Sequence, residues 1–240
     1  MNKKVAIIMP YYNEKDLLVE SVKSILNQTY TNWHLYLVDD GSVKGNRAYE
    51  VLQLSPDMEK KITISYKPNG GVSKARNTAI GLINADQHYI EVDGFYDRFI
   101  DYVAYCDSDD VWDSNYLEEQ VKALGNADFV YSSVRHRFVD GNVAVPYGIE
   151  DFPVFPGLDV LLKNNFIFIS GVVHKQSIMI GNFDDTLNSI EDWDYWVRIA
   201  KLNYKIVKNL NACFTYIVKP AGNGSKSNKA IYEKFRQKHK

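Results

Sequence analysis

The chain has 240 residues, and its 28 Lys and Arg against 30 Asp and Glu give a formal charge of −2 at pH 7. This near balance excludes a strongly basic nucleic-acid-binding protein, and a hydrophobic fraction of 45% excludes an acidic disordered chain. Tyrosine is frequent, with 17 residues against 11 Phe, which indicates many rings with a polar edge at half-wet surfaces such as clefts.

Up to residue 110 the chain alternates between predicted strands and helices. Val5 to Met9 is a continuous apolar run, typical of a strand buried on both faces, and Asn13 is a suitable N-cap for the helix that follows. Further strands are expected at 34–38, 62–66 and 102–106, and helices at 46–54 and 73–83. This order predicts an α/β fold with a mostly parallel central sheet, right-handed crossovers and helices on both faces.

The second half of the chain is less regular and predicts a smaller, mixed part. Helices are expected at 115–124 and 187–200, strands at 128–132 and 211–218, a hairpin joining 135–139 to 143–145, and a loop at 150–157. Residues 219–240 hold seven basic residues and one acidic residue, which predicts a basic C-terminal tail. Such a tail is either solvated or in peripheral contact with an anionic membrane.

The expected location is the cytoplasm, at most with contact to the inner face of a membrane. Two cysteines, Cys106 and Cys213, are too few for a disulfide framework, which favours a reducing compartment. The apolar run at the N-terminus is too short for a signal peptide, and no run approaches the roughly 18 apolar residues that cross a bilayer.

Polar turns follow three of the predicted strands, at the sheet edge where open α/β folds bind ligands. These turns are Tyr11-Tyr12-Asn13, Asp39-Asp40-Gly41-Ser42 and Asp107-Ser108-Asp109-Asp110. In the third turn, neighbouring carboxylates raise the pKa of one another, and a divalent cation with oxygen ligands, such as Mg²⁺ or Mn²⁺, would relieve this. The alternative is an acidic turn that caps the next helix.

Two further segments combine charge with a helix start. Asn69 to Asn77 joins a glycine-rich turn to Lys74 and Arg76, and free backbone N–H groups there would suit a diphosphate. Helix capping by Ser73 is the simpler explanation. Glu191-Asp192-Trp193-Asp194 offers a candidate general base beside aromatic rings, although acidic residues are favoured in any first helical turn.

In this order the motifs resemble those of the family 2 inverting glycosyltransferases, which have the GT-A fold. The resemblance rests on residues 5–14, 24–30, 37–42, 69–77, 107–112 and 191–192. It implies transfer of a sugar from a nucleoside-diphosphate donor, most often a UDP-sugar, with inversion at the anomeric carbon. The implied acceptor is a hydroxyl of a saccharide, lipid-linked or other glycoconjugate, and the implied cofactor is Mn²⁺ or Mg²⁺.

The resemblance also implies roles for individual residues. Asp192 is the expected general base, and Asp109 of the D-x-D motif is the expected metal ligand. The base of the donor is expected to contact Tyr12 and Asp40. Arg76 is expected to contact the nucleotide, and Asp107 is expected to lie near the ribose. The other candidate substrate-binding residues belong to the same motifs: Pro10, Asn13, Gly71, Ser108, Glu191 and Trp193. The rings expected to contact base or sugar are Tyr11, Tyr12, Tyr195 and those between Tyr89 and Tyr105.

A single GT-A domain is expected over residues 1–218, with a nucleotide-sugar-binding half at 1–112 and an acceptor-binding half at 113–218. Residues 87–100 depart from the family pattern, because they separate the helix after the glycine-rich turn from the D-x-D strand. They predict an inserted hairpin or flap around an Asp-Gly turn. Since no membrane helix follows, we expect addition of a single sugar rather than membrane-embedded polysaccharide synthesis.

Three alternatives remain beside this function. A sugar-nucleotide nucleotidyltransferase also uses a parallel sheet and a metal-binding Asp, but would want a glycine-rich basic loop where Pro10-Tyr11-Tyr12-Asn13 stands. A catalytically silent module would bind nucleotide sugars or glycans without turning them over. Gly71-x-Ser73-x-Ala75 resembles a degraded nucleophile elbow, but no clear Asp and His partners follow, which argues against a hydrolase.

Overall fold

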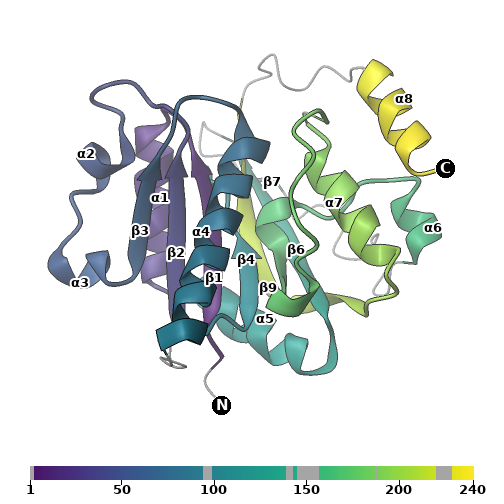
Figure 1. Cartoon of the computed structure of the whole chain (residues 1–240), viewed down its shortest axis with the longest axis horizontal. Helices are drawn as coiled ribbons and strands as arrows, with labels where there is room; N and C mark the ends of the chain where they lie inside the picture. Colours follow the sequence, from purple (N-terminus) through teal and green to yellow (C-terminus); the bar gives the residue numbers. More distant parts are fainter. Residues whose placement is uncertain (1–2, 94–98, 139–142, 145–156, 188, 220–228) are drawn as a thin grey trace.

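The computed structural model describes residues 3–93, 99–138, 143–144, 157–187, 189–219 and 229–240. One central sheet runs through the molecule, with strand order β3-β2-β1-β4-β8-β6-β9-β5 and with β7 paired to β6 (Figure 1). No helix in these ranges is both long enough and apolar enough to span a membrane.

The N-terminal half of the sheet is parallel, as predicted. Its strands are β1 (Val5–Tyr11), β2 (Trp33–Asp39), β3 (Ile62–Tyr66) and β4 (Tyr102–Tyr105). The helices between them are α1 (Lys15–Leu26), α2 (Ala48–Leu52), α3 (Pro56–Glu59) and α4 (Val72–Asp93).

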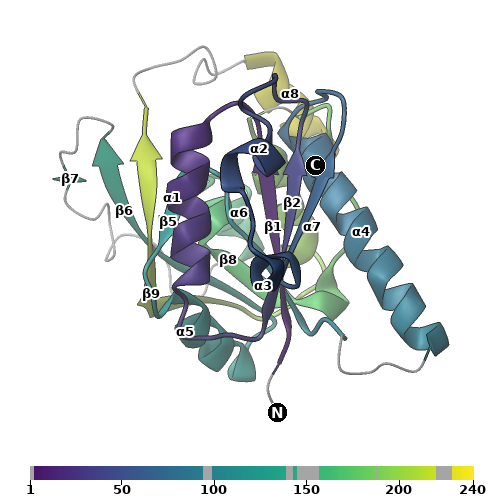
Figure 2. The same ribbon diagram turned by 90° about the vertical axis from the view of Figure 1, so that its left-hand side faces the viewer.

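Two hydrophobic cores, one on each face of the sheet, explain why β1 is apolar at every position. Alternate residues of a strand point to opposite faces. Ile7 and Met9 pack with α1, whereas Ala6 and Ile8 pack with α4. Figure 2 shows these two helices on opposite sides of the strands. The continuous apolar run therefore predicted its buried position correctly.

The second half of the sheet is mixed. β8 (Val172–Lys175) pairs antiparallel with β4 and with β6 (Phe129–Phe138), while β9 (Ile206–Val218) runs parallel to β6 with an irregularity at Ser132/Ser133. β5 (Asp110–Trp112) and β7 (Val143–Ala144) add antiparallel edges. The helices are α5 (Tyr116–Ala123), α6 (Leu158–Leu161), α7 (Glu191–Ala200) and α8 (Lys229–Lys238), with 3-10 turns at Leu124–Asn126, Ile169–Gly171 and Gln176–Ile178.

The predicted pairing of 135–139 with 143–145 is confirmed for β6 and β7, where His136 lies opposite Ala144. Its connecting residues 139–142 and most of the expected loop at 150–157 lie outside the described residues. Strands 128–132 and 135–139, expected to be separate, form the single strand β6. The short strands β5 and β8 were not predicted, because three or four residues carry too little periodicity.

The predicted flap at 87–100 is wrong over its first seven residues, which continue α4 without a break to Asp93. A glycine that follows an acidic residue is typical of a hairpin turn, but a glycine also commonly follows the end of a helix. The sequence is therefore compatible with both structures, and the protein forms the longer helix. The Asp-Gly turn itself falls on residues 94–98, outside the described part of the chain.

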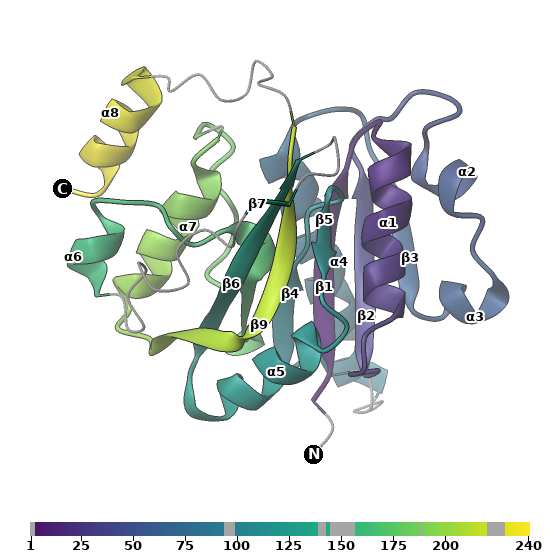
Figure 3. The same cartoon turned by 180° about the vertical axis from the view of Figure 1, so that it is seen from behind.

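The predicted basic tail is also wrong from residue 229 onward, where α8 packs against α7 (Figure 3). Ile231, Tyr232 and Phe235 lie at helical spacing on one face, and Phe235 is buried in the core that surrounds α7. The basic composition concealed this apolar stripe, because the remaining positions of α8 carry the charges.

Candidate active site

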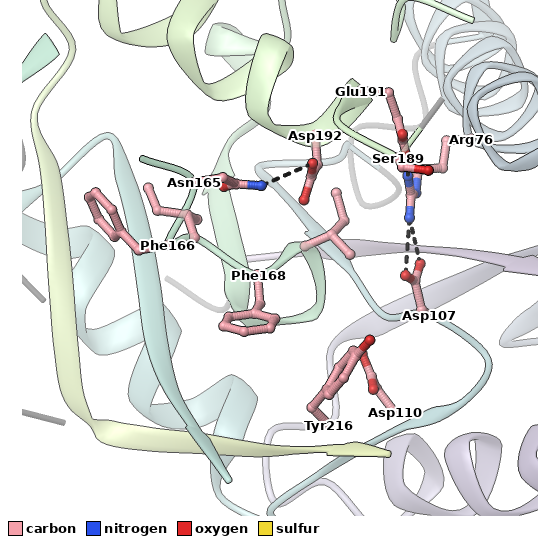
Figure 4. A pocket seen from close by; sticks show the side chains of 12 residues that line it. Arg76, Asp107, Asp110, Asn165, Phe166, Phe168, Ser189, Glu191, Asp192 and Tyr216 are labelled. Carbon is pink, nitrogen blue, oxygen red and sulfur yellow. Dashed lines mark hydrogen bonds and ion pairs between the residues drawn. The ribbon is translucent and has the colours of Figure 1, made fainter. Parts of the chain in front are cut away.

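Two cavities open at the sheet edge where β1, β2 and β4 end, and both reach Asp107. The first cavity, of about 360 Å³, is lined by Pro10, Tyr11, Tyr12, Glu14, Asp40, Asn69, Gly71, Val72, Ala75, Asp107, Ser108 and Asp109. The second cavity, of about 240 Å³, is lined by Arg76, Asp107, Asp110, Asn165, Phe166, Ile167, Phe168, Ile169, Ser189, Glu191, Asp192 and Tyr216 (Figure 4). All but two of the twelve predicted site residues therefore line one cavity or both.

The floor of the first cavity is organised by the buried carboxylate of Asp40. It accepts hydrogen bonds from the backbone N–H groups of Gly70 (3.0 Å) and Gly71 (2.7 Å), and it pairs with the Lys67 ammonium. The glycine-rich turn was predicted to offer these N–H groups to a diphosphate. They are instead occupied by Asp40, whose carboxylate holds the turn in place beside the cavity.

The backbone conformation favours glycine at two positions of this floor, and close packing also requires it at one of them, Gly41. Gly41 and Gly71 have φ angles of +86° and +91°, a conformation that residues with a Cβ atom rarely adopt. A Cβ atom on Gly41 would also lie 2.5 Å from the backbone nitrogen of Asn69. The Asp39-Asp40-Gly41-Ser42 turn thus fits against the 69–71 turn without a side chain between them.

Asn13 supports the same floor but is not the N-cap that the sequence predicted. α1 begins two residues later, at Lys15, and Asn13 itself has a φ of +62°. Its backbone N–H donates to Ser42 Oγ (2.9 Å), and its side-chain Oδ1 accepts from the backbone N–H of Val43 (2.9 Å). Asn13 therefore ties the loop after β1 to the loop after β2, rather than lining either cavity.

Three carboxylates gather at the end of β4. Ligand oxygens of Asp107, Asp109 and Asp110 all lie within 4.8 Å of one another. Asp110 opens strand β5, is 2% exposed, and its Oδ1 has no hydrogen-bond partner among the described residues. Asp110 was recognised as part of the acidic turn but was not predicted as a site residue.

These carboxylates fit a divalent metal ion. Burial, together with the nearby Asp109 and Asp107, raises the pKa of Asp110 well above its ordinary value. Burial and Asp109 also raise the pKa of Asp107, against the opposing effect of Arg76. Mg²⁺ and Mn²⁺ bind carboxylate oxygens, and a bound cation would relieve the repulsion between these three side chains. The unpartnered oxygen of Asp110 makes it a candidate ligand beside Asp109.

Lys219, at the end of β9, brings a positive charge to the same place. Its ammonium lies 2.8 Å from Asp109 Oδ2 and also pairs with Glu14. Both acidic residues line the first cavity. Lys219 therefore partly balances the charge of the acidic cluster. It lies about a hundred positions later in the chain, and no local sequence pattern predicts this contact.

Arg76 connects the acidic cluster to α7. Its buried guanidinium donates from Nη2 to Asp107 (2.8 Å) and from Nη1 to Glu191 (2.8 Å). A buried arginine with two carboxylate partners is held in one orientation. The Arg76 side chain therefore joins the two motifs and lines the second cavity, instead of projecting freely toward the first.

Asp192 lies in the second cavity and directly follows Glu191, the residue that pairs with Arg76 (Figure 4). Burial and the neighbouring Glu191 raise the pKa of Asp192 to about 7. Asp192 Oδ1 accepts hydrogen bonds from the side-chain amide of Asn165 (3.3 Å) and from the backbone N–H of Trp193 (2.7 Å). A carboxylate with a pKa near neutral is well suited to accept a proton at physiological pH.

The first turn of α7 is fixed from behind by α8. Trp193 stacks on Phe235 with ring centroids 4.1 Å apart, and its indole N–H donates to the backbone oxygen of Leu161. Asp194 is fully buried, and it lies 2.7 Å from Lys238 Nζ and 2.9 Å from His239 Nε2. The structure thus places Trp193 in the core behind Asp192, outside both cavities.

Other predicted rings are also core residues. Tyr105 and Tyr195 are fully buried, and Tyr195 stacks on Phe183 with ring centroids 4.3 Å apart. Tyr12 is 49% exposed and lines the first cavity, as expected for a ring that meets a ligand. The large number of tyrosines indicated clefts correctly, but it gave no means of distinguishing cleft residues from core residues.

Several residues of the second cavity had no signal in the sequence. They are Asn165, Phe166, Phe168, Ser189 and Tyr216. Tyr216 lies in β9, and the register of that strand brings it to the cavity. The other four lie in segments without periodic structure. Their proximity to Asp192 depends on how α7 packs, which a motif cannot report.

Comparison with known proteins points to one family. Residues 6–173 match the family described as "Glycosyl transferase family 2". An Escherichia coli relative, "UDP-Glc:alpha-D-GlcNAc-diphosphoundecaprenol beta-1,3-glucosyltransferase WfgD", is 32% identical over 204 residues, covering 83% of this chain and 70% of the relative. A Bacillus subtilis relative, "Putative teichuronic acid biosynthesis glycosyltransferase TuaG", is 30% identical over 129 residues, or 53% of this chain and 44% of that protein. In three Rickettsia relatives the chain spans only 27% to 31% of the length.

Solved structures show the same fold. Staphylococcus aureus TarS 1–349 in complex with UDP-GlcNAc has a TM-score of 0.70 at 18% identity, covering 96% of this chain and 64% of TarS 1–349. The mannosyltransferase PcManGT from Pyrobaculum calidifontis, in complex with GDP-Man and Mn²⁺, has a TM-score of 0.65 at 19% identity, covering 92% of this chain and 58% of that protein. The predicted GT-A fold is confirmed.

Proposed function

Since the chain belongs to glycosyl transferase family 2, we propose that it transfers a sugar from a nucleoside-diphosphate donor to an acceptor hydroxyl, with inversion at the anomeric carbon. The observation that carries this proposal is the meeting of two cavities at Asp107, with Asp109 in the first cavity and Asp192 in the second. Opposite-face attack needs this separation, because the leaving diphosphate and the attacking hydroxyl lie on opposite sides of the sugar.

The donor occupies the first cavity in this proposal. Tyr12 and Asp40 lie at the end where the nucleobase would bind, and Pro10 and Gly71 line the same cavity. Asp107 and Ser108 follow toward the acidic cluster, near the ribose and the diphosphate. A UDP-sugar is the favoured donor, supported by the WfgD relative and by the UDP-GlcNAc complex of TarS.

The diphosphate end of the donor requires positive charge. Asp109 would hold Mn²⁺ or Mg²⁺, with Asp107 and Asp110 near enough to share it. When bound, the metal stabilises the negative charge that develops on the leaving diphosphate. Arg76, through its bonds to Asp107 and Glu191, fixes the orientation of the surrounding carboxylates.

Asp192 acts as the general base. An alcohol is a weak nucleophile, and a carboxylate within hydrogen-bond reach accelerates its attack by accepting the proton. Asn165 holds one carboxylate oxygen of Asp192, and the rest of the side chain faces the second cavity, where the acceptor would bind. Glu191 contributes indirectly, since it binds Arg76 and raises the pKa of Asp192.

The acceptor is a saccharide or glycoconjugate, and a lipid-linked acceptor is supported by the substrate in the name of WfgD. Among the described residues of the C-terminal segment 229–240, the exposed cationic residues outside the ion pairs of Asp194 are Lys229, Lys234, Arg236 and Lys240. They would place α8 at the anionic inner face of a membrane, the surface at which such acceptors are found. Salt-sensitive co-sedimentation with phosphatidylglycerol vesicles, absent with phosphatidylcholine vesicles, tests this location.

Turnover distinguishes this function from its alternatives. The protein is incubated with UDP-, GDP- and dTDP-sugars, Mn²⁺ and a saccharide acceptor panel, and the released nucleotide is identified. A glycosyltransferase releases the nucleoside diphosphate when the acceptor is present. A nucleotidyltransferase instead releases nucleoside triphosphate and sugar 1-phosphate, and only in a parallel incubation to which pyrophosphate is added. Binding of a nucleotide sugar without release of either product contradicts transfer and favours a binding module.

The metal site is tested separately by calorimetry. UDP should bind with Mn²⁺ present and bind much more weakly after chelation, and Asp109→Asn should remove this difference. Asp57→Asn, an exposed aspartate in the short helix α3, serves as the matched control. Equal UDP affinity with and without metal in the unaltered protein would contradict a metal at Asp109.

A further inference from the structure

Asn77 holds the backbone of Phe183 through two hydrogen bonds. Its side-chain amide donates from Nδ2 to the carbonyl oxygen of Phe183 (2.9 Å), and its Oδ1 accepts from the backbone N–H of the same residue (2.8 Å). Two bonds between one amide and one residue fix the orientation of the bound backbone as well as its distance. Asn77 ends the 69–77 motif and lines neither cavity. The motif therefore extends to residues 181–183, which we call the linking segment.

The linking segment is bound from its other side by α7. Tyr195 donates from its hydroxyl to the carbonyl oxygen of Gly181 (3.2 Å), and Arg198 donates from Nη2 to that of Asn182 (2.8 Å). The Phe183 ring also stacks on the Tyr195 ring, with centroids 4.3 Å apart and an interplanar angle of 16°. Three successive carbonyl groups thus connect α7 to α4, although the two helices are far apart in the sequence.

The Phe183 ring covers the guanidinium of Arg76. The guanidinium carbon lies 5.5 Å from the ring centroid, within the range of a cation–π contact. Both residues are 2% exposed, so little water reaches this contact. Nη1 of Arg76 donates to Glu191 (2.8 Å), which lines the second cavity with it (Figure 4). The Nε atom is buried and has no hydrogen-bond partner among the described residues, so packing alone protects its N–H group there.

We propose that Asn77 is a positioning residue for the transfer reaction, acting through Phe183 and Arg76 on the first turn of α7. Arg76 is thereby kept against Glu191, the residue directly before the proposed general base Asp192. This inference rests on the proposed transferase function and adds a residue outside both cavities to it. Each step is a contact between neighbouring groups, which gives the effect of Asn77 a defined physical route. The position of the base matters because it must accept the proton within hydrogen-bond distance.

Solvent exchange of the Arg76 Nε–H group tests the first steps without any substrate. The full chain is labelled with ¹⁵N-arginine, and the Arg76 signal is identified by its loss in Arg76→Lys. In Asn77→Ala the group should exchange about tenfold faster or more, because Phe183 no longer holds its place over the guanidinium. Asn84→Ala, at an exposed asparagine of the same helix, is the matched control and should leave the exchange rate unchanged.

Kinetics test the last step. Asn77→Ala should lower kcat about ten- to a hundredfold while UDP affinity by calorimetry is kept, and Asn84→Ala should change neither quantity. A double-mutant cycle with Glu191→Gln distinguishes positioning from a general loss of structure. If Asn77 acts through Arg76 and Glu191, Asn77→Ala should lower kcat far less in the Glu191→Gln background. Effects of the two substitutions that simply multiply would contradict the inference.

The two measurements separate failure of this inference from failure of the transferase function. If the unaltered protein transfers sugar but Asn77→Ala leaves Arg76 Nε–H exchange or kcat unchanged, the positioning role is wrong and the transferase function stands. Phe183→Leu is a second variant, which keeps the backbone that Asn77 binds and removes the ring over Arg76. Normal exchange and normal kcat in Phe183→Leu overturn the inference even where Asn77→Ala does not fold. If the unaltered protein transfers no sugar, the proposed function fails, and the inference fails with it.

Discussion

The first cavity is formed mainly by turns that follow parallel strands, whereas the second is formed by side chains from five separate segments of the chain. In the first, the Asp40 carboxylate binds the backbone of the 69–71 turn, so that the main chain itself shapes the cavity. In the second, Asp192 depends on α7, which depends in turn on packing against α8. Substitutions should therefore act locally in the first cavity and at longer range in the second.

The largest expected effect is on the chemical step in the second cavity. Asp192→Asn removes the proton acceptor while keeping the side-chain shape, and general-base catalysis contributes roughly a hundredfold to ten-thousandfold in rate. We expect kcat to fall by that order, with an unchanged UDP affinity by calorimetry because the first cavity is untouched. Asp185→Asn, at an exposed acidic residue, is the matched control. Unaltered transfer by Asp192→Asn would remove it from the mechanism.

A large effect at longer range is expected from α8. Phe235→Ala removes the ring that stacks on Trp193, and buried Phe→Ala changes cost about 3–5 kcal/mol of unfolding free energy. Below the unfolding transition, kcat should also fall while UDP affinity is kept, since α7 and not the first cavity loses its support. Phe138→Ala removes the same group at a ring that is 42% exposed, and should change neither quantity substantially. Parallel loss of UDP binding and kcat in folded Phe235→Ala would show that the two cavities are not independent.

The pH dependence of transfer also tests whether the two cavities act separately, with a smaller expected effect that changes gradually with pH. With the pKa of Asp192 at about 7, the carboxyl group is protonated below that pH and cannot accept the proton of the acceptor. The rate at low acceptor concentration should rise nearly tenfold per pH unit up to about pH 7 and then level off. UDP binding should not follow this profile. The residual activity of Asp192→Asn should lose the slope, and a slope that persists in that variant would assign it to another group.

The sequence predicted the first cavity better than the second, for a physical reason. Strand ends and glycine turns are local, so Asp40, Gly71 and Asp107, which follow apolar runs in the sequence, line the same cavity. Glu191 and Asp192 were identified as a motif, but Phe168 and Tyr216 come together only through tertiary packing. The same limit applies to α8, whose basic composition predicted a tail although its apolar stripe is buried.

Gly41 offers the smallest expected effect and the sharpest test of main-chain control in the first cavity. Alanine at a φ of +86° is strained by about 1–3 kcal/mol, and its Cβ atom would lie 2.5 Å from the Asn69 backbone. The 69–71 turn must then shift, so UDP affinity should fall while kcat, which depends on Asp192 in the second cavity, is kept. Gly81→Ala is the matched control, because its Cβ atom meets nothing within 4 Å and alanine favours the helix by about 1 kcal/mol. If Gly41→Ala instead lowers UDP affinity and kcat together, the shift of the turn passes through Asp107 and Arg76 into the second cavity, and the two cavities act as one site.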